Sequence, residues 1–96
     1  MKMYLIIYDA GFDDELFEVL ESSKIKGFTK WIEVMGKGEK SEQKMGDAIW
    51  PGFNNAIMIV LEPQEETILI QELNKLYEKM GSMGLRVYNW PVEKII

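Results

Sequence analysis

The clearest pattern in this sequence is a set of four short runs that suit β-strands. Residues 3–8 and 56–61 are apolar throughout, which is typical of strands that are covered on both faces. Residues 28–35 combine β-branched and aromatic side chains with partial alternation, and residues 85–90 form a fourth run. The sequence therefore predicts four strands, with Pro91 ending the pairing of the last one or placing it at a sheet edge.

Apolar residues recur at helical spacing between the first two runs. They follow the i, i+3, i+4 pattern of an amphipathic helix: Leu16, Val19 and Leu20, with Phe17 widening the stripe. This pattern predicts a helix over residues 14–23, and we expect Asp13 or Asp14 to cap its first turn.

A second helix is predicted to begin at Pro63, because proline is tolerated in a first turn and acidic residues follow it. The helix should end at Gly81, after Lys75 and Lys79, which suit the negative end of the helix dipole. Its apolar face consists of Leu69, Leu73, Leu76 and Met80, joined by Ile70 and Tyr77.

The order of these elements is β-α-β-loop-β-α-β. With right-handed crossovers it folds as a ferredoxin-like sandwich of the α+β class, one antiparallel sheet with two helices on one face. We expect one domain over residues 1–96, with a long loop at residues 39–54 between the second and third strands. Because the first and third strands are apolar on both sides, the face without helices is unsuited to water, so we expect a homo-oligomer.

Charge and length narrow the classes of partner. The 96 residues include 11 basic and 16 acidic side chains. The formal charge of -5 disfavours binding to nucleic acid and to anionic membranes. The sequence has no run of about 20 apolar residues, which is the length that spans a bilayer as a helix. Its first residues enter a strand and show no signal-peptide cleavage pattern. We therefore expect a cytoplasmic protein that does not insert into a membrane.

The chain has neither cysteine nor histidine. This composition excludes disulfides, thiol nucleophiles, histidine-based triads and the usual zinc ligands, and it points to no particular cofactor. Asp9, Asp13, Asp14 and Glu15 cluster near the start of the first helix and could supply carboxylates for catalysis. Acidic residues at that place are also the ordinary response to a helix dipole, so we expect neither an enzyme nor a metal site.

The long loop begins and ends with distinctive motifs. Backbone amides beside Gly36 and Gly38 could approach an anion closely, with Lys37 and Lys40 adding positive charge. The same glycines could instead only permit a bulge or bend where the strand leaves the sheet. At the far end, residues 50–53 form a turn that would anchor the loop, or an aromatic pair that would bind a partner.

These motifs resemble those of the PII signalling proteins, the nitrogen regulatory proteins. In that family a Gly-x-Thr turn opens the second strand and a Gly-x-Gly closes it before the flexible T-loop. Residues 27–29 and 36–38 occupy those places, and residues 91–93 match the segment after the fourth strand. The resemblance covers nearly the whole chain. It implies a homotrimer that binds adenine nucleotides between subunits and uses its T-loop to contact transporters, enzymes or regulators.

The sequence also departs from classical PII proteins. The loop has no tyrosine to accept uridylylation, and Ser41 is best explained as a solvated residue. Residues 81–86 replace a longer phosphate-binding loop, with Arg86 as the obvious cation. The C-terminal basic residues of the family's nucleotide site are missing before Ile96, so the better description is a PII-like protein, in the wider group that includes the CutA-type trimers.

By this resemblance the chain is a signal-transduction protein that binds a small anion, an adenine nucleotide or another, or no ligand at all. The ligand site would comprise Gly36, Lys37, Gly38, Lys40 and Arg86. The partner-binding loop would present Glu39, Ser41, Lys44, Trp50 and Phe53. The alternative is an interaction or structural protein of the same fold that acts without a ligand.

Overall fold

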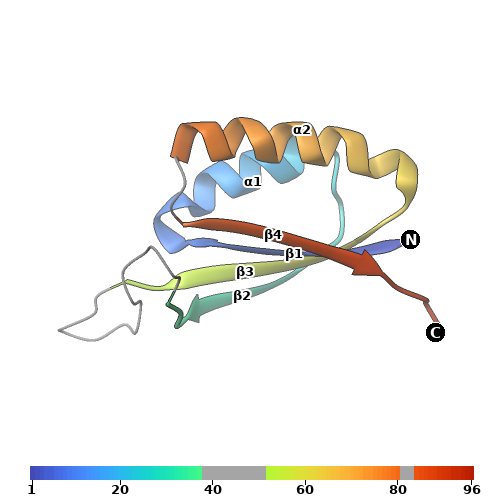
Figure 1. Cartoon of the computed structure of the whole chain (residues 1–96), viewed down its shortest axis with the longest axis horizontal. Coiled ribbons are helices and arrows are strands. Elements are labelled where there is room, and N and C mark those ends of the chain that lie inside the picture. Colours follow the sequence, from blue (N-terminus) through green and yellow to red (C-terminus); the bar gives the residue numbers. More distant parts are fainter. Residues whose placement is uncertain (38–51, 81–83) are drawn as a thin grey trace.

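The computed structural model describes residues 1–37, 52–80 and 84–96. Its elements follow the predicted order (Figure 1): β1 (Lys2–Asp9), a 3-10 turn (Ala10–Phe12), α1 (Asp13–Ser22), β2 (Thr29–Val34), β3 (Asn54–Leu61), α2 (Pro63–Met80) and β4 (Leu85–Pro91). Each predicted strand and helix is present, with ends that differ by no more than two residues. The ferredoxin-like α+β fold is confirmed.

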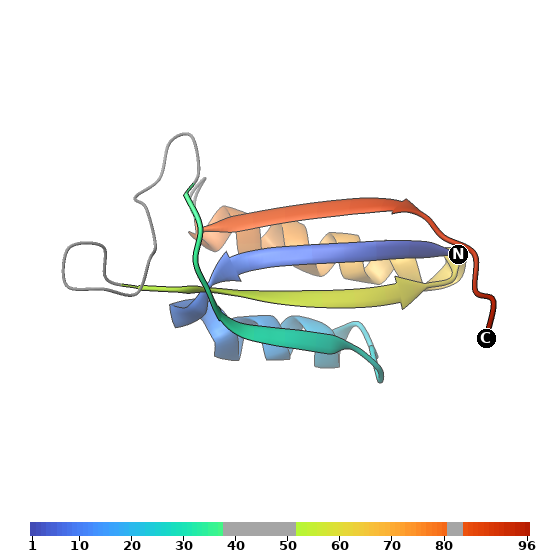
Figure 2. The same cartoon turned by 90° about the horizontal axis from the view of Figure 1, so that it is seen from below.

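The four strands form one antiparallel sheet in the order β2-β3-β1-β4. Both helices cover the same face of it. Figure 2 shows the sheet from its other side, with α1 behind β2 and β3 and with α2 behind β1 and β4. Pro91 is the last residue of β4, and β4 is an edge strand, as the sequence predicted.

The hydrophobic core lies between the sheet and the helices. Alternate residues of β1, namely Tyr4, Ile6 and Tyr8, point to the helices and are buried. The register places Ile57 of β3 opposite Ile6, and α1 and α2 contribute leucines to the same cluster. The two predicted apolar faces therefore meet the sheet as expected.

The start of α1 differs from the prediction. Neither Asp13 nor Asp14 is an N-cap, because Phe12 occupies that position without a side-chain hydrogen bond. Asp9 instead caps the preceding 3-10 turn by accepting a hydrogen bond from the Gly11 amide at 2.8 Å. The sequence pattern did not reveal this short turn. The capping side chain is therefore Asp9, four residues before the predicted Asp13.

Ile70 and Tyr77, which the sequence added to the apolar face of α2, are exposed at the side of that face. Their exposed fractions are 42% and 38%, whereas Leu69, Leu73 and Leu76 are buried. The reason is tertiary: the sheet ends at β4, so no further strand lies beneath that side of the helix.

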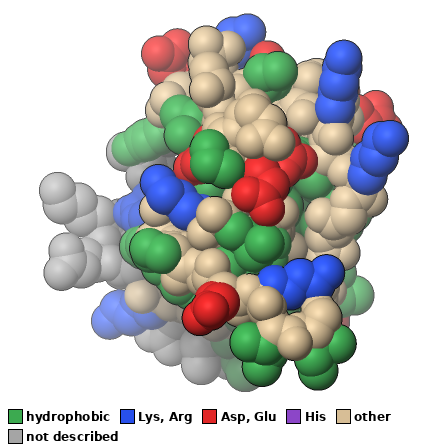
Figure 3. All heavy atoms as spheres, turned by 90° about the vertical axis from the view of Figure 1, so that its right-hand side faces the viewer, with side chains coloured by type: hydrophobic (Ala, Val, Ile, Leu, Met, Phe, Trp, Pro, Cys, Tyr) green, Lys and Arg blue, Asp and Glu red, His purple; other side chains and the backbone are tan. Residues whose placement is uncertain are grey.

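The face of the sheet away from the helices, here called the open face, is rich in apolar side chains. Its members lie at positions that alternate with the helix-facing ones: Met3, Leu5, Ile7, Trp31, Ala56, Met58, Val60, Tyr88 and Trp90. Trp31, Tyr88 and Trp90 are exposed. Figure 3 views one end of the molecule, where charged and apolar side chains are interspersed and apolar side chains also lie at the lower rim. Among the described residues, no helix is long and apolar enough to cross a membrane.

Candidate functional site

Four of the residues predicted to bind a ligand or partner lie in the described part of the chain: Gly36, Lys37, Phe53 and Arg86. The others, Gly38, Glu39, Lys40, Ser41, Lys44 and Trp50, lie outside the described residues. The structure therefore locates Gly36 and Lys37 at the start of the predicted anion site, and Arg86, its distant cation.

The described residues that flank both undescribed segments meet at the end of β1. The Asp9 amide donates to the Gly84 carbonyl oxygen at 2.8 Å, and the Ala10 amide donates to the Phe53 carbonyl oxygen at 3.0 Å. These two bonds tie the approach to β4 and the approach to β3 to one short stretch of backbone. The segment after β2 and the start of β4 also lie at this end of the sheet (Figures 1 and 2).

Gly36 makes a close approach to β3. A Cβ atom at this position would lie 2.9 Å from Asn54 Nδ2, and the φ of Gly36 is outside the left-handed region. Glycine is therefore favoured here by lack of space rather than by an unusual backbone angle. The observation agrees with the interpretation in which this glycine permits the chain to bend where it leaves the sheet.

Arg86 lies on β4 opposite Ile7, which places its side chain on the open face. Its Nη1 donates to the Leu85 carbonyl oxygen at 2.9 Å. Lys37 is exposed beyond β2 at the opposite edge of the sheet. The two predicted cations thus share an end of the sheet but belong to different edges.

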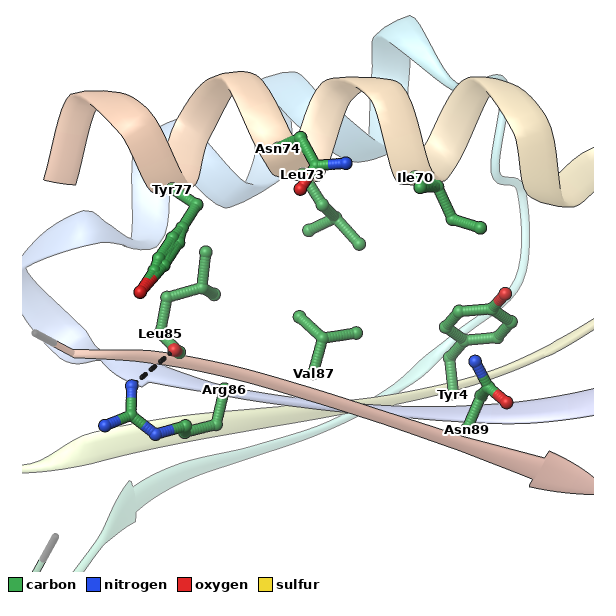
Figure 4. A pocket seen from close by; sticks show the side chains of 9 residues that line it. All are labelled: Tyr4, Ile70, Leu73, Asn74, Tyr77, Leu85, Arg86, Val87 and Asn89. Atoms are coloured by element: carbon green, nitrogen blue, oxygen red, sulfur yellow. Dashed lines mark hydrogen bonds between the residues drawn. The ribbon is translucent and has the colours of Figure 1, made fainter. Parts of the chain in front are cut away.

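A groove that the sequence did not reveal runs between α2 and β4 (Figure 4). It has a volume of about 480 Å³. Its walls are Tyr4, Ile70, Leu73, Asn74, Tyr77, Leu85, Arg86, Val87 and Asn89. The guanidinium of Arg86 points away from it in Figure 4, so the inner walls carry aliphatic groups, two carboxamides and two tyrosines. The sequence signal was the excess width of the apolar face of α2.

Tyr4 at one end of the α2–β4 groove is held by hydrogen bonds. Its hydroxyl donates to Glu66 Oε1, and Lys2 Nζ lies 3.6 Å from the same oxygen. Burial, with the Glu66 carboxylate adding to it, raises the pKa of Tyr4 to about 12. The hydrogen bond from Tyr4, helped by Lys2, lowers the pKa of Glu66.

A second polar cluster, the Asp13 cluster, joins α1 to three strands. Asp13 Oδ1 accepts hydrogen bonds from the Tyr8 hydroxyl at 2.6 Å and from Asn55 Nδ2 at 3.0 Å. Lys30 Nζ lies 2.7 Å from Asp13 Oδ1 and 2.7 Å from Oδ2. It also lies 4.7 Å from the centre of the Phe17 ring.

The charges in the Asp13 cluster are mutually stabilised. Burial alone would raise the pKa of Asp13, but the hydrogen bonds from Lys30, Tyr8 and Asn55 outweigh it and lower that pKa. Burial, then the Asp13 carboxylate, raises the pKa of Tyr8. The carboxylate nominated as a catalytic candidate is thus engaged by three side chains, an arrangement that serves structure.

The cluster also reaches the irregular part of β2. Asn55 Oδ1 accepts a hydrogen bond from the Glu33 amide at 3.1 Å. Glu33 has a φ of 57° and lies where the β2–β3 register shifts between Trp31 and Val34. The buried Asn55 therefore compensates a backbone amide that the bulge removes from the strand ladder.

No protein-family model matches the sequence, and no curated protein matches it. Solved structures do match it. One is CPII, a nitrogen regulatory PII-like protein from Thiomonas intermedia K12, bound to ADP, AMP and bicarbonate, with a TM-score of 0.74 and 16% identity over 93% of this chain and 82% of that chain. The chain has the PII-like fold.

Two further structures of the same protein agree. CPII bound to ADP and bicarbonate matches with a TM-score of 0.70 and 17% identity, over 97% of this chain and 88% of that chain. The apo form matches with a TM-score of 0.68 and 15% identity, over 93% and 85%. The PII-like resemblance drawn from the glycine and threonine motifs is confirmed at the level of the fold.

Proposed function

We propose that this chain is a PII-like regulatory protein of the cytoplasm. It forms a trimer, binds a small anionic ligand between subunits, and uses the loop at residues 39–54 to contact a protein such as a transporter or an enzyme. An adenine nucleotide is the first candidate ligand. The protein transmits a signal and catalyses no reaction.

The observation that carries this proposal is the fold shared with a PII-like protein solved with ADP, AMP and bicarbonate. The apolar open face supports the assembly, because exposed Trp31, Tyr88 and Trp90 on one face favour contact with other copies. A face of this kind is costly to leave in water, since apolar burial contributes about 25 cal/mol per Å².

The proposed ligand site comprises Gly36, Lys37, Gly38, Lys40 and Arg86. Support comes from the described members, since Lys37 and Arg86 lie at one end of the sheet and Arg86 is on the open face. An arginine suits a phosphate or bicarbonate because its planar guanidinium binds such anions through paired hydrogen bonds. In a ring of copies, the β2 edge of one subunit, which carries Lys37, lies beside the β4 edge of the next subunit, which carries Arg86.

The test is isothermal titration of the protein with ATP, ADP, AMP and bicarbonate. The Arg86→Gln variant should bind the effective ligand about tenfold to a hundredfold more weakly, because a hydrogen bond to a charged group contributes about 1.5–3 kcal/mol. Lys79→Gln, an exposed cation on α2, is the matched control and should bind as the wild type does. If none of the four compounds produces heat at millimolar concentration, the ligand part of the proposal fails.

The ligand-independent alternative has one observation in its favour. The contact between Gly36 and Asn54 explains the glycine without an anion. In that case a pull-down with the wild-type protein should capture a partner regardless of added nucleotide, and deletion of residues 41–53 should abolish the capture. A capture that changes with ADP or ATP would support the regulatory proposal instead.

A further inference from the structure

Both edges of the sheet are unpartnered in the described part of the chain. The order β2-β3-β1-β4 leaves β2 and β4 each with one hydrogen-bonded neighbour. Edge strands expose unpaired backbone groups, and proteins usually protect them with charges, coverage or another copy. At this sheet, apolar side chains lie at both edges and on both sides of the sheet.

The β4 edge is concave on its helix side. The α2–β4 groove lies there, with Ile70 and Tyr77 on one wall and Val87 on the other (Figure 4). All three side chains are exposed. On the open side of the same edge, Tyr88 and Trp90 are exposed as well.

The β2 edge carries exposed aromatic side chains. Phe17 of α1 and Phe28 before β2 form an edge-to-face pair, the phenylalanine pair, with ring centroids 5.9 Å apart. Their exposed fractions are 37% and 38%, so more than a third of the surface of each residue is open to a partner. On the open side of this edge, Trp31 is exposed.

We propose that the α2–β4 groove is a docking site for a second copy of this chain, and that the phenylalanine pair of that copy fills it. The inference rests on the oligomer of the proposed function and specifies which surfaces meet. The strands permit the contact. Four alternating antiparallel strands leave β2 and β4 running in opposite directions (Figure 2), so a neighbour in the same orientation places its β2 antiparallel to β4.

Repeating this contact closes a ring. The two surfaces are different, so the contact is head-to-tail, and such contacts form rings when the rotation closes. In the ring the open faces turn inward, where Trp31 of one copy approaches Tyr88 and Trp90 of the next. No sheet edge then remains, as in a closed barrel.

The chemistry of the groove favours this occupant over the proposed anionic ligand. The guanidinium of Arg86 turns away from the groove, and the Glu66 carboxylate engages Tyr4 at its end. The remaining walls offer aliphatic, aromatic and amide groups. A phosphate or bicarbonate in the groove would lose bound water and find no positive side chain to pair with. An aromatic ring in the groove would instead bury apolar surface that is unfavourable in water.

The experiment uses two variants that each damage one surface of the full chain. Ile70→Glu places a charge in the groove and keeps the phenylalanine pair, whereas Phe28→Glu disrupts the pair and keeps the groove. Ile68→Glu is the matched control, since Ile68 lies on the same helix, is 44% exposed and does not line the groove. All these positions are partly exposed, so circular dichroism should show folded proteins.

Light scattering after gel filtration should show an oligomer for the wild type and for Ile68→Glu, and monomers for Ile70→Glu and for Phe28→Glu. A mixture of the two monomeric variants should form a one-to-one heterodimer and stop there, because it contains one intact contact and one damaged contact. This result separates a head-to-tail contact from a symmetric one.

The inference is overturned if either folded variant keeps the wild-type mass, or if the mixture stays monomeric at the highest attainable concentration. These results would leave the proposed function standing, because the wild type would still be an oligomer. A monomeric wild type would overturn both the trimer and this contact, while nucleotide titration would still test the ligand.

Discussion

Replacing Asp13 by alanine should destabilise the fold far more than an ordinary surface change. The substitution removes the acceptor of the Tyr8 hydroxyl at 2.6 Å and of Asn55 Nδ2 at 3.0 Å, and it leaves Lys30 without its counter-ion. Tyr8 and Asn55 are 0% and 5% exposed, so water cannot easily replace the lost acceptor. A buried polar group without a partner costs about 1–3 kcal/mol, and with partial relaxation we expect about 2–4 kcal/mol in total.

This loss is a large share of the stability of a domain of this size, which is about 5–15 kcal/mol. Urea unfolding at one fixed protein concentration measures it, as a lower midpoint with an unchanged slope. Asp14→Ala is the matched control, because Asp14 is a neighbouring first-turn carboxylate that is exposed. It should cost only about 0.3–1 kcal/mol through the helix dipole.

Lowering the pH should reduce the difference in unfolding free energy between Asp13→Ala and the wild type. The pKa of Asp13 is lowered in the folded protein, so its contribution is present above the unfolded value of about 4 and is lost as the pH falls through the folded value. Equal midpoints for Asp13→Ala and Asp14→Ala at neutral pH would refute the assignment of the Asp13 cluster as a stabilising element.

Three further predictions follow from backbone angles and one buried hydroxyl. Lys24 has a φ of 59° in the turn that ends α1, so Lys24→Gly should raise the unfolding free energy by about 0.5–1 kcal/mol, whereas Lys26→Gly should not. Gly84 has a φ of 81°, and its Cβ would lie 3.2 Å from Asp9 Cβ, so Gly84→Ala should lower the thermal midpoint, with a cost of about 1–2 kcal/mol. Burial raises the pKa of Tyr4 to about 12, so stability should fall as the pH rises from about 10 to 12; urea midpoints of Tyr4→Phe should fall less over that range. A Lys24→Gly variant less stable than the wild type, a neutral Gly84→Ala, or an unchanged alkaline slope for Tyr4→Phe would contradict the respective argument.

The groove and the phenylalanine pair bear on where a ligand would bind. If neighbouring copies fill the α2–β4 groove, this hollow of about 480 Å³ is part of an interface. The anion proposed for Arg86 would then meet the protein on the open side of the sheet, because the register places that side chain opposite Ile7. Titration of Ile70→Glu with ADP would show whether ligand binding requires the assembled ring.

Local patterns identified most of the fold because their causes are local. The continuous apolar runs at residues 3–8 and 56–61, and the proline that starts α2, each depend on a few neighbouring residues, and every such element is present. The predicted N-cap of α1 was wrong, because the 3-10 turn at Ala10–Phe12 has no periodic signal in the sequence. The side chain that caps is Asp9, at the start of that turn. The candidate site was only partly accessible to the same reasoning. Asp13 stood out as a carboxylate, but its partners Lys30 and Asn55 are 17 and 42 residues away in the chain.

The sequence by itself determined the strands, the helices, their order and the surplus of apolar surface on one face of the sheet. These properties follow from spacing along the chain, so they need no knowledge of which segments touch. Only the tertiary structure decided that Ile70 and Tyr77 face a groove, that Asp13 binds three side chains, and that Gly36 adjoins Asn54. Burial and pairing depend on where the sheet ends and on residues distant in sequence, and those relations exist only once the chain has folded.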